Sequence, residues 1–272
     1  RPAGALAAGG KASLPGADCA ASALGERVLL ARRGPAPALS PALAPAQALH
    51  TDAPVYRRVW EALAAPRVGA AGAAAAPPPS GHWLIVCDAG GVGQALAYGL
   101  QACGQQVERV DRSDFPALGE RLRAWVRGQQ GGLGRIVHLR GLDAQLDAQT
   151  TGDELRAAQQ HSLGELLGLL GALGAAEVSG LAQLAIVTRG AQAVAPGEAP
   201  ALAQAPLWGF SQVAALGHPE LRLALWDLDP LASARENAQQ LLAALLQRDG
   251  GEGGEGEEAL RGRRRLVPRL QR

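Results

Sequence analysis

The sequence predicts an α/β protein built on a truncated, Rossmann-like parallel sheet with helices on both faces. Two observations lead to this prediction. From residue 81 onward, short apolar runs alternate with longer amphipathic stretches, a pattern typical of right-handed βαβ units in a parallel sheet. A glycine-rich turn also joins the first of these runs to the first amphipathic stretch, as in other sheets of this class.

The individual elements follow from hydrophobic periodicity. Short runs of buried character predict five strands, at Trp83–Cys87, Gln106–Val110, Arg135–Leu139, Leu184–Thr188 and Leu221–Trp226. Apolar side chains at i, i+3 and i+4 predict five helices, over residues 92–103, 116–129, 152–175, 200–216 and 234–248. We expect residues 81–248 to form the Rossmann-like core.

The flanking regions differ from this core. Residues 1–53 are rich in Ala, Pro and Gly, which predicts an interdomain linker. Residues 54–248 then form one subdomain, which begins with a strand at Val55–Trp60. We interpret residues 249–272 as an exit linker with an edge strand, because the Gly/Glu-rich start favours disorder and Pro268 restricts the following strand-like run to an edge or a strand end.

Composition excludes several classes of function. The 272 residues carry a formal charge of +1, so no overall field favours nucleic acid or an anionic membrane. Cys19, Cys87 and Cys103 are too few and scattered for a disulfide framework or zinc set, and no apolar run reaches the roughly 18 residues of a membrane span. We therefore expect a cytoplasmic protein. The chain contains no Met, so we expect it to be a piece of something longer.

The turn from Cys87 to Leu96 lies where a dinucleotide pyrophosphate would meet a helix N-terminus. Gly91 and Gly93 can begin a GxGxxG pattern, but its third glycine position is occupied by Leu96. Asp88 would also place a carboxylate near the phosphates, where like charges repel. We therefore predict that this turn binds no cofactor.

Asp111 follows the second strand about 20 residues beyond the glycines, the distance of a ribose-binding acid. Arg112 is open to interpretation as a phosphate partner. We favour a simpler interpretation, in which residues 111–114 form a turn with side-chain caps that leads to a helix start at Pro116.

Residues for the common catalytic schemes are missing from the sequence. The lone lysine is Lys11, and the residues four beyond Tyr56 and Tyr98 are Trp60 and Ala102, so no Tyr-x-x-x-Lys pair exists. The serines, for instance Ser162, Ser179 and Ser211, do not lie in a Gly-x-Ser-x-Gly elbow. We therefore predict no catalytic residues in this chain.

The histidines and acidic pairs give no ligand set. The histidines are dispersed along the chain, at positions His50, His82, His138, His161 and His218, so we predict no metal site. His138 ends an apolar strand, where a satisfied core or turn residue is commoner than a catalytic base. Asp227 and Asp229 follow the last predicted strand and could form a paired-acid site, but Asp-x-Asp-Pro is as natural in a turn, which we favour.

Four blocks in the last third of the chain carry a resemblance to a known family. They are Ala185–Val194, Ala205–Phe210, His218–Leu221 and Trp226–Pro230. In this order and spacing they resemble the structural subdomain of the ketoreductase region of bacterial modular type I polyketide synthases. The Val55–Trp60 strand, the triple proline at 77–79, the Asp88–Leu96 turn and the closing Leu260–Leu270 run extend the resemblance to residues 54–270.

The resemblance implies a specific role. The family's structural subdomain is a truncated short-chain-dehydrogenase fold without cofactor or catalytic residues. It packs against a catalytic subdomain that binds NADPH and reduces β-ketoacyl chains on acyl carrier protein. An enoylreductase can be inserted between the two. The resemblance thus implies a scaffold that stabilises and orients that catalytic half, docking through apolar helix faces and the Val55–Trp60 strand.

Two other hypotheses remain open at this point. One is an autonomous NAD(P)-dependent oxidoreductase that uses the Gly90–Gly93 turn and an unusual acid, against which the missing Tyr and Lys count. The other is a carrier-protein docking module, in which arginines such as Arg189 and Arg222 would contact phosphopantetheine or acidic helices.

Overall fold

The computed structural model describes residues 56–63, 81–128, 134–147, 149–176, 181, 183–247 and 256–272. All of these belong to one compact unit, residues 54–272. The predicted linker at 1–53 and the triple proline at 77–79 lie outside the described residues. So do residues 248–255, Lys11, Cys19, His50 and Ser179.

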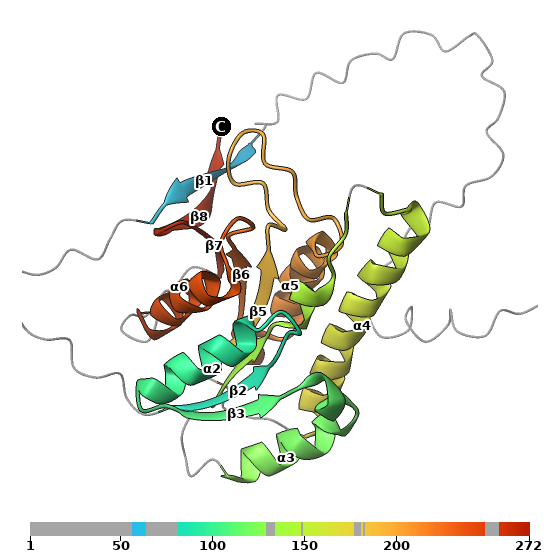
Figure 1. Cartoon of the computed structure of the whole chain (residues 1–272), viewed down its shortest axis with the longest axis vertical. Helices are drawn as coiled ribbons and strands as arrows, with labels where there is room; N and C mark the ends of the chain where they lie inside the picture. The colour runs from blue at the N-terminus through green and yellow to red at the C-terminus, as the bar shows by residue number, and fades with distance from the viewer. Residues whose placement is uncertain are drawn as a thin grey trace, which may run out of the picture. The chain divides into compact units, whose positions relative to one another are not determined.

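One sheet of eight strands organises the described residues, in the order β1-β8-β7-β6-β5-β4-β2-β3 (Figure 1). The six strands β2 to β7 run parallel to one another. Strand β8 is antiparallel to both of its neighbours, β7 and β1. The strands are β1 (Arg57–Ala62), β2 (His82–Val86), β3 (Gln106–Val110), β4 (Gly134–His138), β5 (Gln183–Arg189), β6 (Leu223–Leu228), β7 (Glu257–Arg261) and β8 (Arg264–Gln271). The predicted Rossmann-like class is confirmed, with a mixed rather than wholly parallel sheet.

Helices cover both faces of the sheet. On one face lie α2 (Val92–Ala102) and α6 (Ala234–Gln247), which pack side by side (Figure 1). On the other lie α3 (Leu118–Gly128), α4 (Gly152–Ala175) and α5 (Ala205–Gly217). Alternate strand residues point to opposite faces, so Ile85 and Val187 join the α2/α6 core while Leu84 and Ile186 join the α3/α4/α5 core.

The helix boundaries have local causes. Helix α4 begins where predicted because Thr151 and Glu154 form a reciprocal capping box: the Thr151 hydroxyl accepts from Glu154 N, and Glu154 accepts from Thr151 N. Helix α5 begins five residues later than predicted, because the segment before it is a loop that ends at Gln204.

Strand β6 begins two residues later than predicted. Leu221 belongs to a 3₁₀ turn, Pro219–Leu221, and Arg222 adopts a left-handed conformation with φ of +45° before the strand starts. A left-handed residue interrupts both helix and strand geometry.

The interpretation of residues 249–272 as an exit linker with an edge strand is wrong for the described part, 256–272. Glu257 and Glu258, predicted to be unstructured, begin β7, which lies between β6 and β8. Strand β8 is not at the edge, because β1 pairs along its outer side. Pro268 fits there because it faces Trp60 across an antiparallel pair near the end of the sheet.

Candidate functional site

The order of the strands reverses at β2. The chain passes from β2 to its neighbour β3 and returns across β2 to β4. In open α/β sheets, ligands bind outside the carboxyl ends of the strands at such a reversal. The glycine turn after β2 and the Leu139–Asp143 segment after β4 therefore form the first candidate site.

The glycines of this turn are required by backbone geometry. Gly91 adopts a φ of +87°, which an L side chain rarely tolerates. A Cβ on Gly93 would lie 3.0 Å from Cys87 Cα, so helix α2 can approach β2 this closely only because residue 93 lacks a side chain. Both glycines have a structural reason that involves no phosphate.

The amino end of α2 is already occupied by a carboxylate of the protein. Asp88, which is largely buried, accepts hydrogen bonds from Gly93 N at 2.7 Å and Val92 N at 3.2 Å. These are the N–H groups that a helix presents to a phosphate. The carboxylate oxygens of Asp88 therefore stand where phosphate oxygens would stand in a dinucleotide complex.

A second acidic and basic cluster fills the β4 side of the reversal. Asp143 accepts from Ala89 N at 2.7 Å and from Arg140 at 2.9 Å. The buried Arg140 guanidinium also donates to Glu165 of α4. This cluster ties the glycine turn, the segment after β4 and helix α4 together, and sequence reasoning missed it because its members lie far apart in the chain.

Asp111 is also engaged within the protein. It accepts two hydrogen bonds from the Arg109 guanidinium, at 2.9 and 3.2 Å. The predicted turn is present, since Asp114 N donates to Asp111 O at 3.0 Å, but the Asp111 side chain makes no cap hydrogen bond. The helical segment starts at Arg112, before the predicted start at Pro116. Arg112 is exposed.

Among the described residues, neither the two tyrosines nor Ser162 and Ser211 are hydrogen-bonded to a catalytic base. Tyr98 lies on the outer side of α2 with 59% of its surface exposed, and Tyr56 is 54% exposed. Ser162 is buried in α4, where its hydroxyl donates to Ala158 O at 2.9 Å. Ser211 is buried in α5.

Among the described histidines, His138 has an unusual environment. It is fully buried at the end of β4, and neither ring nitrogen has a hydrogen-bond partner. Burial, with a smaller contribution from Arg140, lowers its pKa to about 3. His161 and His218 are exposed and lie beside Glu165 and Glu220. Within the described ranges, no three His, Cys, Asp or Glu side chains are grouped to hold a metal ion.

Asp227 and Asp229 have different surroundings. Asp227 lies within strand β6 rather than in a turn, and is fully buried. It accepts from Thr188 Oγ1 at 2.7 Å, Ala191 N at 2.8 Å and Arg261 Nη2 at 2.7 Å. Burial raises the pKa of its carboxyl, and the Arg261 guanidinium opposes that increase.

Asp229 is the residue that forms the predicted turn. Its carboxylate accepts from Leu231 N at 2.9 Å and from Gly262 N at 2.8 Å. The two aspartates therefore hold the loop after β5 and the β7–β8 hairpin to the end of β6. Arg261 completes the arrangement by donating to the Leu228 and Gln192 carbonyls at 2.9 Å each.

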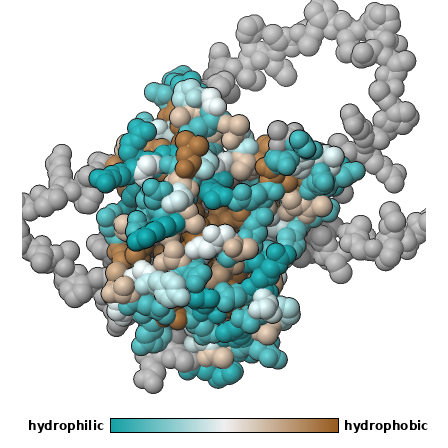
Figure 2. Space-filling model, viewed as in Figure 1, coloured by the Kyte–Doolittle hydropathy of each residue, from teal (hydrophilic) through white to brown (hydrophobic). Residues whose placement is uncertain are grey.

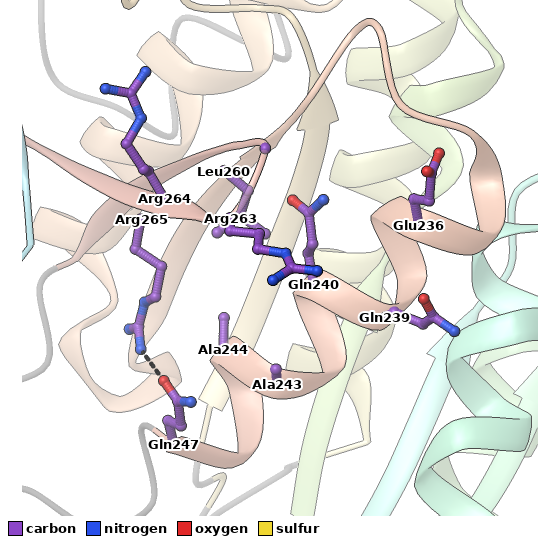
Figure 3. A pocket seen from close by; sticks show the side chains of 11 residues that line it. Glu236, Gln239, Gln240, Ala243, Ala244, Gln247, Leu260, Arg263, Arg264 and Arg265 are labelled. Atoms are coloured by element: carbon purple, nitrogen blue, oxygen red, sulfur yellow. Dashed lines mark hydrogen bonds between the residues drawn. The ribbon is translucent and has the colours of Figure 1, made fainter. Parts of the chain in front are cut away.

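A cavity of about 590 Å³ lies between α6 and the β7–β8 turn (Figure 3). Gln240 and Arg263 both line it, and Arg265 donates to Gln247 Oε1 at 3.0 Å. Strands β4, β5 and β6 separate this region of the sheet from β2, so the cavity is not part of the glycine-turn site.

In the part of the chain that the structure describes, none of the helices combines the length and apolar character needed to cross a bilayer.

Comparison with known proteins identifies the family. Residues 5–270 match the family model described as "Polyketide synthase extender module SpnB, Rossmann fold domain". The chain belongs to this family. It is a subdomain of the ketoreductase region of a modular polyketide synthase, in agreement with the resemblance noted in the sequence.

Relatives of this polyketide synthase domain are much longer proteins. The chain is 31% identical over 201 residues to a phenolphthiocerol/phthiocerol polyketide synthase of Mycobacterium tuberculosis, a match that covers 72% of the chain and 12% of that relative. It is 33% identical over 213 residues to polyketide synthase GfsA of Streptomyces halstedii, covering 74% of the chain and 3% of the relative. The chain thus spans a small part of the relatives it matches.

Solved structures similar to this domain include ketoreductases. A C2-type ketoreductase from a modular polyketide synthase is 27% identical with a TM-score of 0.59, over 80% of this chain and 43% of that one. The first ketoreductase of the tylosin polyketide synthase is 27% identical with a TM-score of 0.56, over 80% and 41%.

Proposed function

We propose that this domain is a non-catalytic half of a ketoreductase, which stabilises and orients a separate, NADPH-dependent catalytic subdomain that reduces β-ketoacyl intermediates on acyl carrier protein. The observation that carries the proposal is the position of Asp88. Its carboxylate accepts from Val92 N and Gly93 N at the amino end of α2, so the place of a cofactor phosphate is filled by the protein.

Electrostatics supports this proposal. A pyrophosphate brought to the start of α2 would have to displace the Asp88 carboxylate from two hydrogen bonds. It would then lie beside two carboxylates, Asp88 and Asp143. Like charges at such distances repel strongly where water is scarce. Arg140, the nearest cation of the cluster, is already bonded to Asp143 and Glu165.

The residue inventory also supports it. Reduction of a ketone needs a proton donor beside the transferred hydride. The chain's two tyrosines are Tyr56 and Tyr98, its one lysine is Lys11, and both tyrosines are more than half exposed. We propose that NADPH and the proton donor belong to the adjoining catalytic subdomain.

The surfaces we propose for docking are the β1 strand and the apolar outer sides of α4 and α5. Strand β1 forms one edge of the sheet, and Leu167 of α4 with Val213 and Leu216 of α5 are 52%, 55% and 86% exposed. On the face shown in Figure 2, hydrophobic side chains form separate patches in a largely hydrophilic surface. Other synthase domains, including an enoylreductase or acyl carrier protein, are further candidate partners.

A second candidate function is an autonomous NAD(P)-dependent oxidoreductase. It is favoured by one observation, the left-handed Gly91 at the start of α2, in the turn after strand β2, where the strand order reverses. In that case Asp88 would have to turn away when the dinucleotide binds.

Calorimetric titration of NADPH into the purified chain distinguishes these functions. We expect no binding by the chain alone. Micromolar binding that Gly91→Val abolishes would overturn the proposal and establish the oxidoreductase. Gly197→Val is the matched control, because Gly197 is exposed and also adopts a left-handed conformation. Circular dichroism of each variant verifies that it is folded.

A further inference from the structure

A second cavity, of about 400 Å³, lies over the carboxyl ends of β4 and β5. This volume is within the range of small-molecule sites. One wall comes from the segment after β4 and the start of α4, and includes Leu146 and Leu155. The other comes from the end of β5 and the loop that follows, and includes Arg189 and Leu202.

The two walls are joined by hydrogen bonds. Gln204, which is almost completely buried, accepts from Arg189 N at 2.9 Å and donates to the Ala144 carbonyl at 3.4 Å. Gln159 of α4 donates to the Leu202 carbonyl at 2.8 Å. Polar contacts therefore connect the two walls of the cavity.

Apolar side chains are exposed on both walls. Leu202 is 55% exposed and Leu146 is 38% exposed, and Pro200, Ala201 and Pro230 add further apolar lining. Single exposed leucines are ordinary on protein surfaces, but exposed leucines on opposite sides of one cavity offer a place for a hydrocarbon chain.

One residue of the cavity lining, Arg189, is a cation that has no partner among the described residues. The guanidinium of Arg189 makes no hydrogen bond, ion pair or ring contact with any residue in the described ranges, although its backbone N–H is bonded to Gln204. Asp147, the carboxylate in the lining, instead accepts from Gln149 N and Thr150 Oγ1 of its own loop. An anionic group in the cavity would therefore find an available partner in Arg189.

We propose that this cavity binds a linear amphipathic anion, an acyl chain with a carboxylate at its end. The acyl chain lies between Leu146 and Leu202, and the carboxylate pairs with Arg189. This proposal goes beyond the scaffolding role and does not depend on it, because it concerns neither NADPH nor the docking surfaces.

Sodium octanoate is a suitable probe, with hexanoate and neutral 1-octanol as comparisons. Titration of each into the 272-residue chain, followed by calorimetry, is expected to show tighter binding of octanoate than of either comparison. A charge-assisted hydrogen bond contributes about 1.5–3 kcal/mol, so Arg189→Gln is expected to weaken octanoate binding about tenfold or more without changing the affinity for octanol.

Two matched controls make the result decisive. Arg222→Gln removes an exposed arginine outside the cavity, and Leu216→Ser removes an exposed leucine of α5; neither is expected to change binding. Leu202→Ser is expected to weaken octanoate and octanol alike. The proposal is overturned if octanoate does not bind to the folded chain, or if Arg189→Gln and Arg222→Gln bind it equally well. NADPH binding is measured separately, so failure here leaves the proposed scaffold function untouched.

Discussion

Asp88 has a local structural role in addition to the one we propose for it, the exclusion of a cofactor phosphate. Its two hydrogen bonds to α2 satisfy N–H groups that a helix leaves without internal partners. The sequence indicated the electrostatic conflict with a phosphate, since a carboxylate in that turn is visible in the chain. It could not indicate the direction of the side chain, which depends on the approach of α2 to β2.

Replacement of Asp88 tests this role. We expect Asp88→Ala to lower the free energy of unfolding by about 1 kcal/mol, as for other lost helix caps. Urea denaturation followed by circular dichroism measures it. Asp153→Ala is the matched control, because Asp153 is exposed in the first turn of α4 and pairs with Arg156 on the surface. Equal effects of the two substitutions would contradict the role assigned to Asp88.

The burial of His138 predicts a specific dependence of stability on pH. The pKa of His138 is about 3 in the folded state and 6.5 when unperturbed. Between these values the unfolded state binds the extra proton, so stability increases as pH rises from 3 to 6.5. At pH 5 the histidine lowers stability by roughly 2 kcal/mol relative to neutral pH.

His138→Leu removes this titration. We expect its free energy of unfolding to vary less between pH 4 and pH 7 than that of the unmodified chain, in urea denaturation at each pH. The exposed His161→Leu serves as control and is expected to keep the original slope. An unchanged slope in His138→Leu would show that other groups cause the acid sensitivity.

At the level of elements, the sequence predicted the strands from β2 to β5 well. Strand β3 has the predicted boundaries, and β2, β4 and β5 differ by one residue at their ends. Strand β7 was missed because two glutamates begin it. Glu257 is held by Arg58 and Gln212, and Glu258 by Arg265, and these partners come from parts of the chain that no local pattern connects.

Substitution of Ala for glycine at two positions in different helices should have opposite effects on stability. Gly93→Ala would place a Cβ 3.0 Å from Cys87 Cα. We therefore expect overpacking to lower the free energy of unfolding by about 1–3 kcal/mol. Gly171 is exposed within α4 and has free space around it, so Gly171→Ala is expected to stabilise by about 1 kcal/mol. Thermal unfolding of both variants measures the difference. A destabilised Gly171→Ala would mean that the outer face of α4 is not open.

The β7–β8 hairpin is anchored by the buried pair of Asp227 and Arg261. Removal of one member of such a pair typically lowers the free energy of unfolding by about 3–5 kcal/mol, because the remaining charge is buried without a partner. We expect this loss for Arg261→Met in urea denaturation, and little change for the exposed neighbour Arg263→Met. The double variant Asp227→Asn with Arg261→Met should recover part of the loss. Recovery of none of it would indicate that Arg261 acts through its carbonyl contacts alone.

Across the whole molecule, the family could be recognised from the sequence, because four blocks occur in order between Ala185 and Pro230. The buried clusters of charged side chains could not be recognised in this way. Arg140 and Glu165 are 25 residues apart, and Asp227 and Arg261 are 34 apart. Asp227 and Arg261 meet because β6 and β7 are parallel neighbours in the sheet, and Arg140 meets Glu165 because α4 packs against the segment after β4.

The central claim is that this domain supports a catalytic subdomain and does not itself reduce a substrate. The measurement that tests it most directly is NADPH oxidation with a model β-keto thioester, by this chain alone, by the separately expressed catalytic half alone, and by their mixture. The account predicts no turnover by the chain, and a mixture that is more active and unfolds at a higher temperature than the catalytic half alone. Turnover by this chain alone, or a catalytic half that is equally active and stable without it, would contradict the account.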